Sequence, residues 1–119
     1  MQMELLKAYK NENLIIQEVE NANHFFRRFM GLMYRKSLAE NRGLLLTPCN
    51  EIHTFFMRFA IDTVYISKDN TIVYIDEAVE PNKIRKRVKG AYKVLELNAG
   101  IAKEIGIAAG DKINFLSNK

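Results

Sequence analysis

The chain has 119 residues, of which 48% are hydrophobic and 27% charged, and its formal net charge is +4. This length fits one domain, residues 1–119, without room for a second core, and the composition is that of a globular protein. The mild positive charge permits an anionic partner but does not require one.

The cellular compartment can be predicted from the single cysteine, and membrane contact from the absence of a signal peptide pattern and of a long apolar run. Cys49 is the single cysteine, which excludes an intrachain disulfide and favours a reducing compartment. The first residues do not have the pattern of a signal peptide, and no window approaches the ~18 apolar residues of a membrane span. We therefore expect a cytoplasmic protein that does not contact a membrane.

The first third of the chain predicts a hairpin and a helix. Residues 5–9 and 14–19 favour β-structure, and four polar residues separate them, so a hairpin is expected. Asn23 is a suitable helix N-cap. The residues after it that lie at i, i+3, i+4 and i+7 form one apolar face, which we interpret as core. They are Phe26, Phe29, Met30 and Met33.

Strands dominate the middle of the chain. A further helical turn is expected over residues 37–40, and the apolar run 44–47, stopped by a proline, predicts a buried strand. Residues 64–66 alternate with polar neighbours and predict a strand with one face inward. Residues 68–71 predict a tight turn, and residues 72–79 the partner strand.

The last third predicts two more strands around one short helix. Residues 92–98 alternate as a strand, residues 101–105 favour a helix that ends at Gly106, and residues 112–116 close the chain as a strand. About seven short strands with one or two small helices predict a mainly β fold, at the margin of α+β. The expected architecture is a single antiparallel β sandwich or barrel.

Several short motifs resemble a known family in their order and spacing. They are Arg28 with Gly31-Leu32-Met33 and Arg35, Phe56-Met57 with Asp62, Val94 to Gly100, and Gly106-Ile107 with Gly110-Asp111. From about Asn23 to Phe115 the chain resembles the domain-of-unknown-function family number 192. The resemblance implies a compact, mainly β fold without an agreed activity. Many members carry an export leader, and many have tryptophan, asparagine and proline where this chain has residues 53–54 and 58–61.

Three residues spaced by four, Cys49, His53 and Met57, are of types that bind Cu(I) or Zn. On a strand they would lie ~13 Å apart and could not share an ion, so at most Cys49 and His53 could meet through a loop. Single soft residues commonly serve packing. We therefore expect no metal and no cofactor, with Met57 in the core.

Two carboxylates, Asp62 and Glu96, interrupt apolar strands, where a charge is expected only if it is paired or used. One interpretation is an acid/base pair or an anchor for a polar ligand. The other, which we favour, is a structural ion pair without chemistry. The side chains expected to surround these carboxylates are Arg28, Arg35, Arg58, His53 and Asn98.

Residues 83–89 carry five basic side chains, a pattern that can contact phosphates. No aromatic residues are interleaved with them and no nucleic-acid-binding motif accompanies them. We interpret the run as a solvated loop or a lysine-protected edge strand, and do not expect nucleic acid as the partner.

The sequence favours a monomeric, non-catalytic binding module. Its expected partner is a small polar ligand or a loop of another protein, held near Asp62 and Glu96. The alternative is a small hydrolase-like enzyme that uses the two carboxyls as acid and base and needs both to face one space. A weaker alternative is nucleic-acid contact through residues 83–89.

Overall fold

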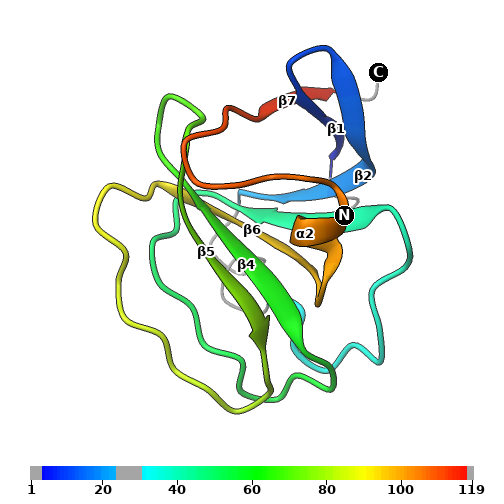
Figure 1. Cartoon of the computed structure of the whole chain (residues 1–119). Coiled ribbons are helices and arrows are strands. Elements are labelled where there is room, and N and C mark those ends of the chain that lie inside the picture. Colours follow the sequence, from blue (N-terminus) through cyan, green and yellow to red (C-terminus); the bar gives the residue numbers. More distant parts are fainter. Residues whose placement is uncertain (1–3, 24–30, 118–119) are drawn as a thin grey trace.

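The computed structural model describes residues 4–23 and 31–117. Seven strands and one short helix make up this part of the chain (Figure 1). In chain order they are β1 (Leu5–Lys10), β2 (Asn13–Ala22), β3 (Arg42–Leu46), β4 (Ile61–Ile66), β5 (Ile72–Val79), β6 (Lys93–Asn98), α2 (Ile101–Glu104) and β7 (Asn114–Ser117).

The strands form one sheet in the order β5-β4-β6-β3-β2-β1-β7. Neighbours are antiparallel except β2 and β3, which are parallel, because the long connection between them lets the chain return in the same direction. The edge strands β5 and β7 do not pair with each other, so the sheet does not close. An isolated bridge joins Thr71, before β5, to Lys112, before β7. The predicted mainly β single domain is confirmed. The sandwich or barrel is corrected to one open, mostly antiparallel sheet.

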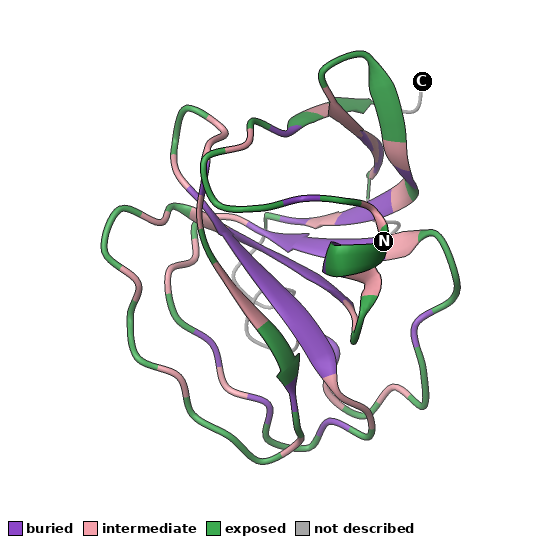
Figure 2. Ribbon diagram, viewed as in Figure 1, coloured by how far each residue is buried: buried purple, intermediate pink, exposed green. Residues whose placement is uncertain are grey.

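The centre of the sheet is buried on both faces. All six residues of β4 are buried, as Figure 2 shows along its length. Val64 and Leu95 belong to one core, whereas Tyr65 and Val94 belong to a second core on the opposite face. The expectation that β4 has only one inward face is therefore wrong, since loops and α2 cover what would otherwise be a solvated side.

Local predictions hold best where turn chemistry is strong. The β1–β2 and β4–β5 hairpins are confirmed, and Asn70 has the positive φ of 68° expected in the second turn. The helix that ends before Gly106 is confirmed as α2.

Two helical segments were predicted between β2 and β3, and neither is confirmed by the described residues. The predicted helix after Asn23 lies mostly outside the described residues, and Met33 lies in a turn. The helical turn predicted at residues 37–40 is wrong: the segment is irregular, and a turn covers Glu40 and Asn41. No helix in the described ranges is long and apolar enough to cross a membrane.

Candidate functional site

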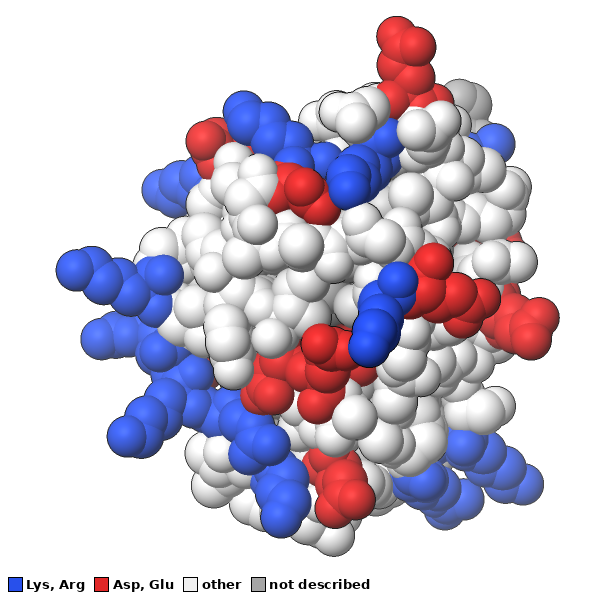
Figure 3. Space-filling view, viewed as in Figure 1, with Lys and Arg blue, Asp and Glu red and all other residues white. Residues whose placement is uncertain are grey.

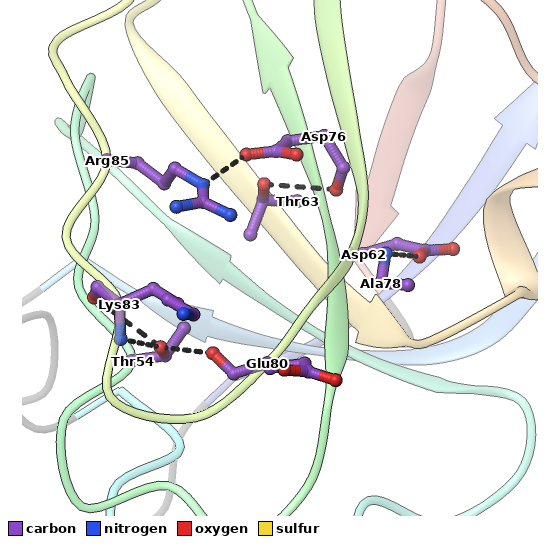
Figure 4. Close-up of polar contacts among 8 residues, drawn as sticks. All are labelled: Thr54, Asp62, Thr63, Asp76, Ala78, Glu80, Lys83 and Arg85. Atoms are coloured by element: carbon purple, nitrogen blue, oxygen red, sulfur yellow. Dashed lines mark hydrogen bonds and ion pairs between the residues drawn. The ribbon is translucent and has the colours of Figure 1, made fainter.

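Asp62 is fully buried and its carboxylate accepts three backbone hydrogen bonds. Oδ1 accepts from the Ala78 N–H at 2.8 Å (Figure 4), and Oδ2 accepts from the N–H groups of Gly100 at 3.0 Å and Ala102 at 2.9 Å. A buried carboxylate is stable when such donors replace its water. Asp62 therefore ties the end of β5 and the start of α2 to β4, which is a structural role.

Glu96 has the opposite environment. Its side chain is 3% exposed, and Oε1 has no hydrogen-bond partner among the described residues. Burial raises the pKa of Glu96 to about 8, against the opposing effect of the Arg35 charge. Tyr65 Oη, on the same face of the sheet, is also buried without a partner in the described ranges, and burial raises the Tyr65 pKa to about 12. Glu96 is thus a buried acid that holds its proton near neutral pH.

The two carboxyls do not face a common space. Asp62 pairs with Leu97 across β4 and β6, whereas Glu96 pairs with Thr63. Since cross-strand partners point to the same face and successive residues to opposite faces, Asp62 and Glu96 lie on opposite sides of the sheet. The core clusters agree, because Leu97 lies in one core and Val94, which shares the face of Glu96, lies in the other. The acid/base pair of the enzymatic alternative is therefore excluded by geometry.

Glu96 instead belongs to a row of residues across the sheet that are polar with one exception, and that we call the polar row. The register aligns Asp76, Thr63, Glu96, Leu44 and Glu20 on five successive strands. An arginine neutralises each end of this row.

At one end the Arg85 Nε donates to Asp76 Oδ2 at 2.8 Å (Figure 4). At the other end Arg35 donates to both oxygens of Glu20, at 2.7 and 3.1 Å, and this hydrogen bonding raises the Arg35 pKa. The ion pair expected for Asp62 or Glu96 is not found among the described residues, in which Arg35 pairs with Glu20 instead.

The remaining predicted site residues are scattered. Asn98 Nδ2 donates to the Leu38 carbonyl at 2.7 Å, which fixes the segment before β3. His53 Nδ1 accepts from the Phe55 N–H at 3.2 Å, and Arg58 is exposed. Arg28 lies outside the described residues.

Thr54 is a structural residue that the sequence did not indicate. Its hydroxyl donates to the Glu80 carbonyl at 2.7 Å and accepts from the Lys83 N–H at 2.8 Å (Figure 4). Backbone bonds continue this contact: Thr54 N–H donates to the Lys83 carbonyl at 2.8 Å, and Arg85 N–H to the Ile52 carbonyl at 3.0 Å. The basic run is therefore paired with residues 50–54, not a free loop.

The described residues do not gather three His, Cys, Asp or Glu side chains that could hold a metal. Met57 is buried in the core, and the Cys49 thiol donates to the Glu51 carbonyl at 3.2 Å. The expected core position of Met57 is therefore confirmed.

A hollow of about 490 Å³ opens elsewhere, between the β1–β2 turn, the β4–β5 turn and β7. It is lined by Tyr9, Asn11, Glu12, Asn70, Asn114, Phe115 and Leu116. Lys93 lies beside it: Nζ donates to Asn70 Oδ1 at 2.6 Å and sits 5.9 Å from the centre of the Phe115 ring. Burial lowers the Lys93 pKa. Nothing in the sequence patterns marked this site, because its lining comes from three distant segments.

A second, smaller hollow of about 160 Å³ lies between Pro48, Cys49, Asn50, Ala91 and Tyr92.

The fold and these sites define a small, mainly β domain with a buried polar row and a separate surface hollow. The chain belongs to the DUF192 family, described as "Uncharacterized ACR", whose profile matches residues 7–115. The resemblance drawn from the short motifs is therefore confirmed.

Similar proteins occur in archaea and bacteria. UPF0127 protein PF1050 of Pyrococcus furiosus is 28% identical over 118 residues, covering 93% of this chain and 97% of that protein. UPF0127 protein PYRAB11210 of Pyrococcus abyssi is 29% identical over 108 residues, covering 84% and 87%.

Two crystal structures have the same fold. A Sinorhizobium meliloti protein described as a "putative transcription regulator" superposes with a TM-score of 0.83 at 27% identity, covering 97% of this chain and 96% of that one. A Novosphingobium aromaticivorans protein of unknown function gives 0.80 at 21% identity, covering 92% and 83%.

Proposed function

We propose that this protein is a non-catalytic binding module whose small polar ligand occupies the hollow between the two turns and β7. The observation that carries the proposal is the composition of this hollow. Its volume of about 490 Å³ lies within the range of roughly 300–1,000 Å³ common for small-ligand sites. The sequence favoured the same class of function but placed the ligand near Asp62 and Glu96.

The lining suits a molecule with hydroxyl or amide groups and one apolar face, and Glu12 adds a carboxylate acceptor. Asn11, Asn70 and Asn114 offer both donors and acceptors, whereas Tyr9 and Phe115 offer aromatic surface. Small sugars and nucleosides have this combination of groups.

A thermal-shift and ligand-observed NMR screen with sugars, nucleosides and small amides tests the proposal. A ligand at about 100 times its Kd adds about 2.7 kcal/mol to the free energy of unfolding, which raises Tm by roughly ten degrees for a domain this size. Asn114→Ala should abolish the shift, and Gln17→Ala, an exposed amide on β2, should not. A shift that survives Asn114→Ala and Tyr9→Leu would refute the site.

A second location is favoured by one observation: Glu96 Oε1 and Tyr65 Oη are buried polar atoms without described partners. Such atoms often contact a bound molecule or water. A ligand there would donate to Glu96, and its thermal shift would disappear in Glu96→Met, which removes the acceptor, and persist in Asn114→Ala. The same screen therefore separates the two locations.

A further inference from the structure

We propose that this protein binds single-stranded nucleic acid at a surface that we call the ribbon patch. The patch consists of the aromatic side chains of Tyr34, Phe55 and Phe56 and the basic side chains of Lys83, Lys86, Arg87 and Lys89. It is separate from the hollow of the proposed small-ligand function.

The fold brings these two sets of residues together although they are distant in the sequence. His53 and Ile84 form an antiparallel bridge, and Thr54 joins Lys83 through its backbone and its hydroxyl. Figure 1 shows the two loops running side by side, before β4 and after β5. Phe55 and Phe56, which follow Thr54 directly, are therefore brought to the Lys83 end of the basic run, and Tyr34 joins them through its contact with Phe56.

The basic side chains of the patch are exposed, and no ion pair is found for them within the described residues. Arg85, in the middle of the run, is the exception, because Asp76 neutralises it. Figure 3 shows Lys and Arg side chains gathered along the left edge of the molecule, over the loop between β5 and β6. Backbone hydrogen bonds join residues 83–88 to residues 50–54, so the backbone that carries these basic side chains has a defined position.

The aromatic side chains are unusually exposed for their size. Tyr34 is 55% and Phe56 is 58% exposed, and their rings stack with centroids 5.4 Å apart. Both residues have left-handed backbone conformations, with φ of 67° and 65°, and the Tyr34 N–H donates to the Phe56 carbonyl at 2.9 Å. Bulky residues rarely adopt this conformation, and such strain is concentrated at functional sites.

Stacking aromatics beside a basic track are the means by which proteins hold single strands. Unpaired bases can stack on the exposed rings while their phosphates meet the cations, whereas the bases of a duplex are already stacked on each other. A lipid surface would favour a broad apolar face, and among the residues that the structure describes Ile84 is the only large exposed aliphatic one adjoining the patch. The combination of groups therefore favours single-stranded nucleic acid.

Fluorescence anisotropy with labelled oligo-dT and oligo-U of about ten nucleotides tests this inference. Four phosphate contacts predict a slope of log K against log salt of about −3, or a loss of about fifty-fold between about 50 and 200 mM salt. Phe56→Ala should weaken binding by about five- to 150-fold, since each stacked base contributes to that extent. Tyr34→Ala provides a second test if Phe56→Ala does not fold.

Two matched controls lie away from the patch. Leu14→Ala removes a side chain that is 45% exposed on β2, and Lys103→Gln removes an exposed charge on α2. Neither should change the affinity, whereas the double variant Lys86→Gln/Arg87→Gln should weaken it and flatten the salt slope.

Three results would overturn the inference. The first is no binding to the oligonucleotides at low salt. The second is equal affinity for duplex and single strand, with Phe56→Ala and Tyr34→Ala leaving the affinity unchanged. The third is no binding to oligonucleotides together with binding to phosphatidylserine vesicles that Phe56→Ala abolishes. The last result would assign the patch to a lipid surface.

Discussion

Replacing Glu96 by glutamine should make the protein more stable at high pH and less sensitive to pH. In the folded state burial raises the Glu96 pKa from 4.5 to about 8, so the folded state binds a proton that the unfolded state releases between these values. The free energy of unfolding therefore falls as pH rises from about 4.5 to about 8. A rise of about 3.5 pKa units, at about 1.36 kcal/mol each, corresponds to about 5 kcal/mol.

Glutamine has nearly the same shape and does not titrate, so the two proteins should be similar in stability at pH 4. The variant should become progressively more stable than the wild type above pH 5, and the difference should level off above pH 8. Urea unfolding followed by circular dichroism at a series of pH values measures it. Glu77→Gln, an exposed position on β5, is the control. The reasoning would be refuted if Glu96→Gln had the pH dependence of the wild type, or were less stable at pH 9.

Three other substitutions test the fold around the sites. Asp62→Asn should lower the free energy of unfolding by about 3 kcal/mol, since three backbone N–H groups lose a charged acceptor; a urea midpoint equal to the wild type would contradict this. Gly43→Ala should cost about 1–3 kcal/mol in the same assay, because its Cβ would lie 3.0 Å from Leu97 Cδ2, and a neutral result would mean that Leu97 can move aside. Thr54→Val should speed hydrogen exchange at the Lys83 amide, which loses its acceptor; unchanged exchange would show that the backbone pairing alone holds the ribbon.

Elements with strong local signals could be predicted from the sequence. Residues 72–79 were predicted as a strand and form β5 with the same bounds, and the turn before it contains Asn70 in the left-handed conformation that asparagine tolerates. The parallel pairing of β2 with β3 could not be predicted, because it depends on how the long connection between them packs. For the same reason the closure expected of a sandwich or barrel was wrong: alternation sets which face is buried, not which edges meet.

The candidate site could be predicted only in part. Asp62 and Glu96 both interrupt apolar strands, and the sequence alone gives them the same interpretation. Their chemistry differs because the register places them on opposite faces of the sheet. The pairing of β4 with β5 shifts register between Asp76 and Val79, and this irregularity brings the Ala78 N–H to Asp62. The start of α2 brings two more N–H groups to Asp62, whereas the row around Glu96 brings none to Oε1.

The hollow escaped sequence analysis, and the basic run 83–89 gave only a weaker alternative, because the residues of both proposed surfaces meet only in the folded chain. The hollow draws its aromatic rings from β1 and β7, near the two ends of the sequence. The ribbon patch draws its rings from the segments before β3 and before β4, and its charges from the loop after β5. At both places side chains that could contribute to the core are instead held at the surface: Leu116 is 56% and Phe56 is 58% exposed. The proposed ligand of the hollow and the proposed nucleic acid of the ribbon patch would each cover one of these side chains, and Phe56 also has a left-handed backbone conformation, with φ of 65°.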